Sequence, residues 1–296
     1  MTPMVDAGHG DALGGRNVAA AVSAPVARTR ARFSRTASLS RWREYEALLR
    51  RATEEGYAIV TLEQWLDDDR PHERVLILRH DVDQCPRSAL TMLEVERELG
   101  VHATWYFRWR TARPRAIDAV LAAGDDVGLH YETLSRMVIA ERAAGRRADP
   151  AELIEPARQM LRRELISFAV LFGERRSACA HGDTRAPDVN NAALLRDIDL
   201  HDYGIDYDAN ASMRSHNLAV WLTDRSRAEG SWRDGLDAGE IIDSHASPVL
   251  LLTHPNNWTS GAGLWLDRLA SSALSEPGLG ASRAVRTGSD APPLAS

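Results

Sequence analysis

One run of residues, Val75–Asp83, constrains the fold more than any other part of the chain. It begins with apolar residues typical of a buried strand and ends in two carboxylates, Asp81 and Asp83. In parallel α/β proteins, the carboxyl ends of the strands carry the chemistry. Two carboxylates one residue apart repel each other, and a divalent metal offsets that repulsion while leaving one of them free to act as a base. The run therefore predicts a strand that leads into a metal-dependent site.

Apolar runs of the same kind recur along the chain, with helical patterns between them. The predicted strands are Val75–Leu78, Ala103–Phe107, Val127–Leu129, Ala178–Ala180, Gly204–Ile205, Leu218–Leu222 and Val249–Leu252. The predicted helices lie between Ser40 and Gly56, over Thr61–Leu66, between Pro86 and Gly100, over Ile117–Leu121, and over Pro150–Phe172. About seven strands that alternate with helices predict an α/β fold, a barrel-like parallel domain.

The two ends of the chain differ in composition from the middle. Residues 1–37 are rich in Ala, Arg and Ser without apolar periodicity, so we expect a disordered leader. Residues 38–270 form the predicted domain, and residues 271–296 are expected to be a disordered tail of Ser, Gly, Ala and Pro. We see no secretory signal and no apolar run long enough to span a membrane, which leads us to expect a cytoplasmic protein.

Composition excludes several classes of function. The net charge of −6 gives no reason to expect nucleic acid or an anionic membrane as a partner. All 36 basic residues are Arg, so Schiff-base lysine chemistry and a P-loop lysine are excluded. The two Cys, Cys85 and Cys179, are too few for a disulfide scaffold or a Cys-based zinc site.

Several predicted strands end in ionisable residues. Besides the acid pair, these are His130-Tyr131-Glu132, His181-Gly182-Asp183, Asp224 and His254-Pro255. In a closed parallel sheet such ends share one rim. A His and Asp set can bind a zinc-like ion, a nearby carboxylate can accept a proton, and a further His can protonate a leaving group. The pattern predicts metal-assisted hydrolysis.

Each of these features also has a simpler interpretation. Asp81 and Asp83 could be a helix N-terminal acid and a cap before Pro86. His130 could be a hydrogen-bonded histidine at the rim, and His254 an ordinary strand terminus. The occurrence of all these residues at strand ends favours a site over the separate interpretations.

The residues from about Val75 to Trp258 resemble the polysaccharide deacetylase family, also called NodB-like or carbohydrate esterase family 4. The resemblance rests on three motifs in order: Arg79-His80-Asp81-Val82-Asp83, Gly128-Leu129-His130, and Leu251-Leu252-Thr253-His254-Pro255. It implies a distorted (β/α) barrel of about seven strands and a divalent metal, usually zinc.

The resemblance also implies roles for individual residues. Asp81 resembles the catalytic base, Asp83 the metal-binding acid and His130 the first metal histidine. His254 resembles the catalytic acid. Arg185-Ala186-Pro187 looks like the Arg-x-Pro segment of the family, whose Arg helps to hold the base.

The chain departs from the family pattern at the second metal histidine. That residue usually lies four positions after the first, and here the position is Leu134, which cannot bind metal. His181 is the first candidate to replace it, with Glu132 and Asp183 behind it. Tyr131, Glu132 and Trp258 are candidates for substrate binding at the same rim.

The function expected from these residues is a metal-dependent hydrolase that removes an N-acetyl or other N-acyl group from a sugar or glycoconjugate. The substrate would be a small molecule or an oligosaccharide. Two rivals stay open. One is hydrolysis of a non-sugar or cyclic amide: rim aromatics facing the metal would favour a sugar, and an arginine clamp facing it would favour a small anionic amide. The other is a non-catalytic carbohydrate-binding or assembly protein that has lost its metal site.

Overall fold

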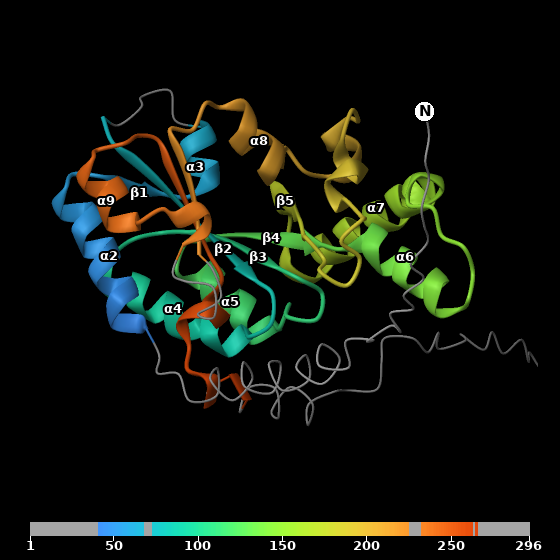
Figure 1. The fold of residues 1–296 in the computed structure, drawn as a ribbon, viewed down its shortest axis with the longest axis horizontal. Helices are drawn as coiled ribbons and strands as arrows, with labels where there is room; N and C mark the ends of the chain where they lie inside the picture. Colours follow the sequence, from blue (N-terminus) through green and yellow to red (C-terminus); the bar gives the residue numbers. More distant parts are fainter. Residues whose placement is uncertain (1–40, 68–72, 225–231, 263, 266–296) are drawn as a thin grey trace, which may run out of the picture.

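A curled parallel sheet organises the computed structural model, which describes residues 41–67, 73–224, 232–262 and 264–265. The strands are β1 (Ala58–Val60), β2 (Val75–Val82), β3 (Thr104–Phe107), β4 (Asp126–Tyr131), β5 (Ser177–Ala180), β6 (Tyr207–Asp208), β7 (Val220–Thr223) and β8 (Val249–Thr253). They follow the order β6-β5-β4-β3-β2-β8-β7, and β1 pairs with the beginning of β2. The result is a distorted half-barrel of parallel strands with helices around it (Figure 1), which confirms the predicted α/β class.

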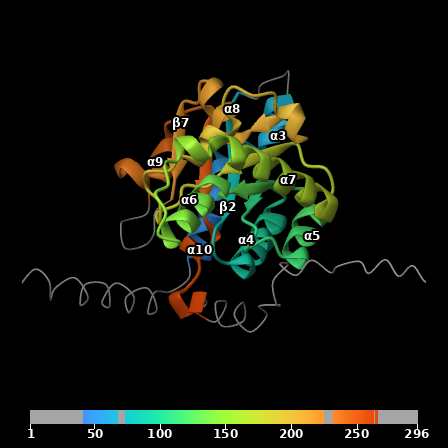
Figure 2. The same ribbon diagram turned by 90° about the vertical axis from the view of Figure 1, so that its right-hand side faces the viewer.

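Helices cover both sides of the sheet. The longer ones are α2 (Trp42–Glu54), α4 (Pro86–Leu99), α5 (Pro114–Ala122), α6 (Thr133–Ala143) and α7 (Ile154–Phe172). The shorter ones are α3 (Leu62–Asp67), α8 (Ala209–Ser215), α9 (Ala238–Asp243) and α10 (Pro255–Trp258). In Figure 1, α4 and α5 lie on one side of the sheet and α3 and α8 on the other. Figure 2 shows the same packing from the α6 and α7 end.

The alternation of side chains along each strand separates two apolar clusters. Leu76 and Leu78 of β2 face the larger cluster, together with residues of α4 and α5. Val75 and Ile77 face the smaller cluster, which fills the concave side of the half-barrel with residues of α3 and α8. Because successive side chains of a strand point to opposite faces, the residues that follow Ile77 at every second position also belong to the concave side.

The predicted strands are confirmed with two differences. The run Gly204–Ile205 is not a strand, and the short strand β6 begins at Tyr207 instead. The chain also has β1, which was not predicted. Both β1 and β6 are two or three residues long, so their periodicity is too brief to identify from sequence.

The helix predictions are confirmed in position, and four of the described helices were missed. Gly100 ends α4 in the left-handed conformation, with a φ of 66°, as its place after the last helical residue predicts. The missed helices are α6, which directly follows β4, and the short helices α8, α9 and α10. The proposed N-cap Ser40 and the predicted terminal segments 1–37 and 271–296 lie outside the described residues.

In the part of the chain that the structure describes, no helix combines the length and the apolarity needed to cross a membrane.

Candidate active site and metal centre

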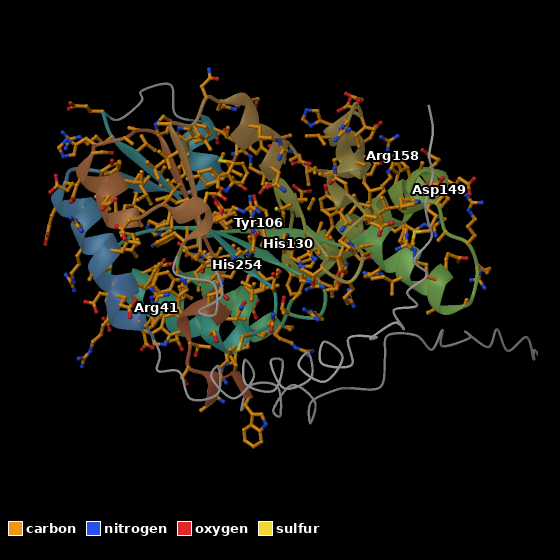
Figure 3. The ribbon with its side chains drawn as sticks, viewed as in Figure 1. Arg41, Tyr106, His130, Asp149, Arg158 and His254 are labelled. Atoms are coloured by element: carbon orange, nitrogen blue, oxygen red, sulfur yellow. The ribbon has the colours of Figure 1, made fainter. Side chains whose placement is uncertain are left out.

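The candidate site lies at the carboxyl ends of β2, β4, β5 and β8, which belong to one parallel sheet. The alternation of β2 puts Arg79 and Asp81 on the concave face, and Asp83 follows directly after the strand. His130 of β4 pairs in register with Cys179 of β5, and His181 comes two residues later on the same side. Figure 3 shows His130 and His254 near each other in the middle of the molecule. Residues about 170 positions apart in sequence therefore meet because all these strands run parallel.

Three side chains bring possible metal-ligand atoms to one point. The Nε2 atom of His130 lies 3.5 Å from Oδ1 of Asp83, and the Nε2 atom of His181 lies 3.4 Å from the same oxygen. The two imidazole rings are perpendicular, with their centroids 5.0 Å apart. Oδ1 of Asp83 is buried and has no hydrogen-bond partner among the described residues. This is the donor set of a zinc-like ion, two histidine nitrogens and one carboxylate oxygen.

The protonation of His130 fits a bound cation. Burial lowers the pKa of His130 to about 4, so the ring is neutral near pH 7. Its Nδ1 lies 3.1 Å from the carbonyl oxygen of Cys179, which only accepts, so Nδ1 carries the proton. The unprotonated Nε2 therefore faces the oxygen of Asp83 with no hydrogen between them. The lone pairs of His130 Nε2 and Asp83 Oδ1 repel each other unless a cation lies between them. The contact with the Cys179 carbonyl holds the His130 ring in the orientation that such a cation needs.

Two other groups of potential ligands are already engaged. Asp81 and Cys179 lie near His130, but Arg79 donates to both. Burial also raises the pKa of the Cys179 thiol well above its usual value, which disfavours the thiolate that binds metal.

Glu132 and Asp183 lie near His181, and each is paired with a guanidinium. Arg108 donates to Glu132, and Arg185 donates to Asp183. The group formed by Asp83, His130 and His181 keeps its ligand atoms most open, so it fits the metal best.

Asp81 is held by Arg79, two residues earlier on the same strand. Nε and Nη2 of Arg79 donate to the two carboxylate oxygens at 3.0 and 2.9 Å. Nη1 donates to Oδ1 of Asn210 at 2.9 Å, and the guanidinium lies 5.1 Å from the ring centroid of Tyr106. Burial alone raises the pKa of Asp81, but the charge and hydrogen bonds of Arg79, together with the charges of His130 and His254, outweigh it and lower the pKa, which keeps the carboxyl ionised.

Arg185, expected to hold the base, makes different contacts. Its Nε and Nη2 donate to Asp183 at 2.9 and 2.5 Å, and Nη2 lies 3.5 Å from Glu132. Arg79 makes the bidentate contact with Asp81 instead. The physical reason is that residues i and i+2 of a strand share a face, so Arg79 and Asp81 are neighbours without any loop between them.

His254 forms a second hydrogen-bonded unit with Asp224. Its Nδ1 lies 2.7 Å from Oδ1 of Asp224, while Oδ2 accepts from the His254 backbone N–H and from Nε1 of Trp258. Burial lowers the pKa of His254, but the charge and hydrogen bond of Asp224, together with the charges of Asp81 and Asp83, outweigh this and raise it to about 9. Nε2 of the ring lies 4.0 Å from Oδ2 of Asp83. This geometry suits an imidazolium that gives up a proton beside the metal cluster.

The three residues predicted for substrate binding are buried. Tyr131 is fully buried, and its hydroxyl lies 3.5 Å from Asp208. Glu132 is paired with Arg108 inside the rim. Trp258 is only 2% exposed, because it packs against Tyr45 and beneath Arg41. None of these three side chains presents an open face on which a sugar could stack.

Sequence reasoning assigned no role to Arg79, Asp224 or Arg108. Arg79 could have been identified, because it shares a strand face with Asp81 and Asp83. Asp224 follows β7, beside the end of β8, so its pairing with His254 was also within reach. The contact between Arg108 and Glu132 joins two different strand ends and depends on side-chain directions that the sequence does not fix.

Comparisons with known proteins give similarities in structure only. No protein-family model and no curated protein matches the chain. Among solved structures, a CE4 family pseudoenzyme from Bacillus anthracis is 13% identical, with a TM-score of 0.39 over 69% of this chain. The present chain spans 61% of the length of that protein.

Two further solved structures are similar. The family 4 carbohydrate esterase from Streptomyces lividans, in complex with acetate, is 17% identical, with a TM-score of 0.36 over 65% of this chain and 86% of the esterase. The peptidoglycan deacetylase PdaC from Bacillus subtilis is 15% identical, with a TM-score of 0.36 over 69% of this chain and 86% of PdaC. The solved structures that are similar to this chain thus include members of carbohydrate esterase family 4, the family that its motifs resemble. At these identities the similarity assigns no activity.

Proposed function

We propose that the chain is a divergent member of the polysaccharide deacetylase family and a metal-dependent hydrolase of N-acyl groups. The observation that carries this proposal is the convergence of His130 Nε2 and His181 Nε2 on the buried Oδ1 of Asp83. In this proposal His181 supplies the ligand that the family takes from the position of Leu134. The arrangement argues against a protein that has lost its metal site.

A zinc-like divalent ion, when bound by Asp83, His130 and His181, would polarise the acyl carbonyl and acidify a water molecule. One of these ligands is held in position by a contact with the backbone. The carbonyl oxygen of Cys179 orients His130, and this contact fixes the tautomer that leaves Nε2 free.

Asp81 serves as the base in this mechanism. Arg79 keeps its carboxylate ionised and in a fixed orientation, and Asp81 Oδ2 lies 3.5 Å from His130 Nε2 beside the metal cluster. A carboxylate so placed accepts the proton of the attacking water. Both oxygens also accept from Arg79, so the lone pairs that face the rim are the ones available to water.

His254 serves as the acid. It is protonated near pH 7 because Asp224, with Asp81 and Asp83, raises its pKa to about 9. Whereas His181 lies near Oδ1 of Asp83, the ring of His254 lies near the other oxygen, Oδ2. From there it donates a proton to the leaving nitrogen, and Asp224 stabilises the imidazolium until transfer. The products are a free amine and a carboxylate, acetate if the group removed is N-acetyl.

The substrate class that we propose first is an N-acetylated sugar or glycoconjugate. Because the aromatic residues predicted to stack on a sugar are buried and Arg185 lies beside the cluster, a small anionic amide is the second candidate. The test is acetate release from N-acetylated sugars by protein loaded with Zn²⁺ or Co²⁺. Asp81→Asn is expected to lower kcat by about 10²-fold or more, because the base contributes that much in general base catalysis. Asp188→Asn, which changes an exposed surface carboxylate, is the matched control and should retain activity.

Asp81→Asn also removes the buried partner of Arg79 and could unfold the protein. His254→Gln is therefore measured beside it, with circular dichroism as the check on folding. The absence of acetate release from every N-acetyl sugar tested, with metal bound, would contradict the proposed activity.

A further inference from the structure

Arg185 is an exposed arginine fixed in place by a buried carboxylate. Asp183 has a side chain that is only 3% exposed, while that of Arg185 is 54% exposed. Asp183 accepts the backbone N–H of Arg185 as well as its Nε and Nη2. An ordinary surface ion pair contributes little to stability, and burying a carboxylate has a cost. We therefore infer that these hydrogen bonds to Asp183 serve to hold the guanidinium of Arg185 in one orientation.

The guanidinium of Arg185 stands next to the proposed metal cluster. Its Nη2 lies 3.5 Å from Oε2 of Glu132, and that oxygen lies 3.7 Å from Nδ1 of the proposed ligand His181. Its contacts with Asp183 use the Nε and Nη2 edge of the group. The Nη1 side takes part in neither of these two contacts, and a planar guanidinium can bind a second group through that side.

Positive charge gathers on this side of the cluster. Arg108 is buried beside Glu132, and burial together with the charges of Arg110 and Arg185 lowers its pKa to about 10. Arg110 donates through Nε and Nη2 to the backbone carbonyl of Asp83, at 3.1 and 2.9 Å. Guanidinium groups therefore approach the cluster from the end of β3 and from the loop after β5.

The role that the family resemblance gives to Arg185 is filled by another residue. Arg79 holds Asp81 through both carboxylate oxygens, so Arg185 is not needed there. The aromatic residues predicted for sugar stacking are buried. An exposed, rigid cation beside the reacting centre is instead suited to a charged substrate, because a group held in advance loses little entropy on binding.

We propose that Arg185 binds an anionic group of the substrate, a carboxylate or a phosphate, beside the N-acyl group that is hydrolysed. This inference rests on the proposed function and deepens it, since it selects acidic N-acyl substrates over neutral ones. Guanidinium recognises both anions through paired hydrogen bonds.

The experiment compares three substrates that share one N-acetyl group. They are the methyl glycoside of N-acetylglucosamine, the 6-phosphate of that glycoside, and the corresponding glycoside in which carbon 6 is oxidised to a carboxylate. The ratio of kcat/KM for each anionic substrate to kcat/KM for the neutral one is measured in the parent. It is measured again in Arg185→Gln and in the control Arg142→Gln, which removes an exposed arginine paired with Asp188.

In the parent we expect kcat/KM for at least one anionic substrate to be well above kcat/KM for the neutral substrate. Whichever anionic substrate gives the larger ratio shows whether the site prefers phosphate or carboxylate. Arg185→Gln should lower that ratio by about 10- to 100-fold, the loss of one charge-assisted pair of hydrogen bonds. Arg142→Gln should leave it unchanged. A parent ratio near one, or a high ratio that survives Arg185→Gln, overturns the inference.

Calorimetric binding of the same three compounds separates this inference from the activity itself. If no compound is hydrolysed, the proposed function fails. The anion site is then supported by tighter binding of an anionic compound to the parent than to Arg185→Gln. It is rejected if the anionic and neutral compounds bind the parent equally, or if none binds.

Discussion

At the scale of the residue, the site depends on two charge pairs with different roles. Arg79 and Asp81 form a bidentate pair with side chains 2% and 6% exposed, which keeps the base ionised. His254 and Asp224 form a pair that keeps the imidazole protonated. Because their surroundings keep Asp81 ionised and His254 protonated, we assign Asp81 as the base and His254 as the acid.

The charge state of His254 gives a prediction about pH. Without metal, NMR titration should give His254 a pKa of about 9, and Asp224→Asn should move it down toward the ordinary histidine value. Because the pKa is raised in the folded state, protonation stabilises folding below the unfolded-state pKa. That contribution is lost as the pH rises through about 9.

The activity of the parent should fall over the same alkaline range, since the acid loses its proton there. His216, an exposed histidine at the C-terminal end of α8, serves as the internal reference in the titration. A His254 pKa near the ordinary value, or one that does not respond to Asp224→Asn, would contradict its assignment as the acid.

Much of the site could be predicted at this scale, because strand periodicity alone places residues on one face. The positions of Asp81, Asp83, His130, His181 and His254 at strand ends follow from it, and the structure brings these side chains together. Which arginine holds Asp81 could not be settled in the same way. That choice depends on whether Arg79 of the same strand or Arg185 of the loop after β5 is directed toward the carboxylate, and the sequence does not give these side-chain directions.

At the scale of the element, the approach of β4 to its neighbours fixes His130. A Cβ atom added at Gly128 would lie 2.5 Å from the Ser177 carbonyl oxygen and 2.6 Å from the ring of Tyr106. The strand can pack this closely only because residue 128 has no side chain. His130, two residues farther along β4, takes its position from that contact.

Gly128→Ala is therefore expected to destabilise the protein by about 1–3 kcal/mol, the usual cost of overpacking, and to weaken zinc binding by displacing β4. Urea unfolding and zinc titration measure the two effects. Gly182→Ala is the control for stability, because a Cβ there meets nothing within 4 Å. If Gly128→Ala unfolds at the parent's urea concentration and binds zinc equally well, the close approach of β4 does not position His130.

The elements that could be predicted are those with enough residues to show a period. β2 has eight residues and α4 has fourteen, and both were found. α6 was missed because its buried positions, Thr133, Leu134, Ser135 and Val138, are partly polar and give no clear apolar stripe. β6 was misplaced because two residues cannot establish an alternation.

At the scale of the whole molecule, the half-barrel brings motifs that are far apart in the sequence to one site. All the pairings of the main sheet are parallel, so every strand ends toward the same rim. Composition sets limits on the chemistry, such as the absence of lysine, but does not locate a site. The order of the strands determines where the site forms, because β8 pairs with β2 and brings His254 next to Asp81 and Asp83.

The central claim is that His181 completes a metal site with Asp83 and His130. The most direct test is the metal content, by elemental analysis, of protein purified without chelator, in the parent and in His181→Ala. His245→Ala is the control, because His245 is exposed and pairs with Glu55 away from the rim.

The account predicts about one equivalent of zinc or a similar transition metal in the parent and in the control, and its loss in His181→Ala. Metal retained at full stoichiometry in His181→Ala would contradict His181 as a ligand and point to Glu132 or Asp183. No metal in the parent, even after zinc is added, would contradict the metal centre itself.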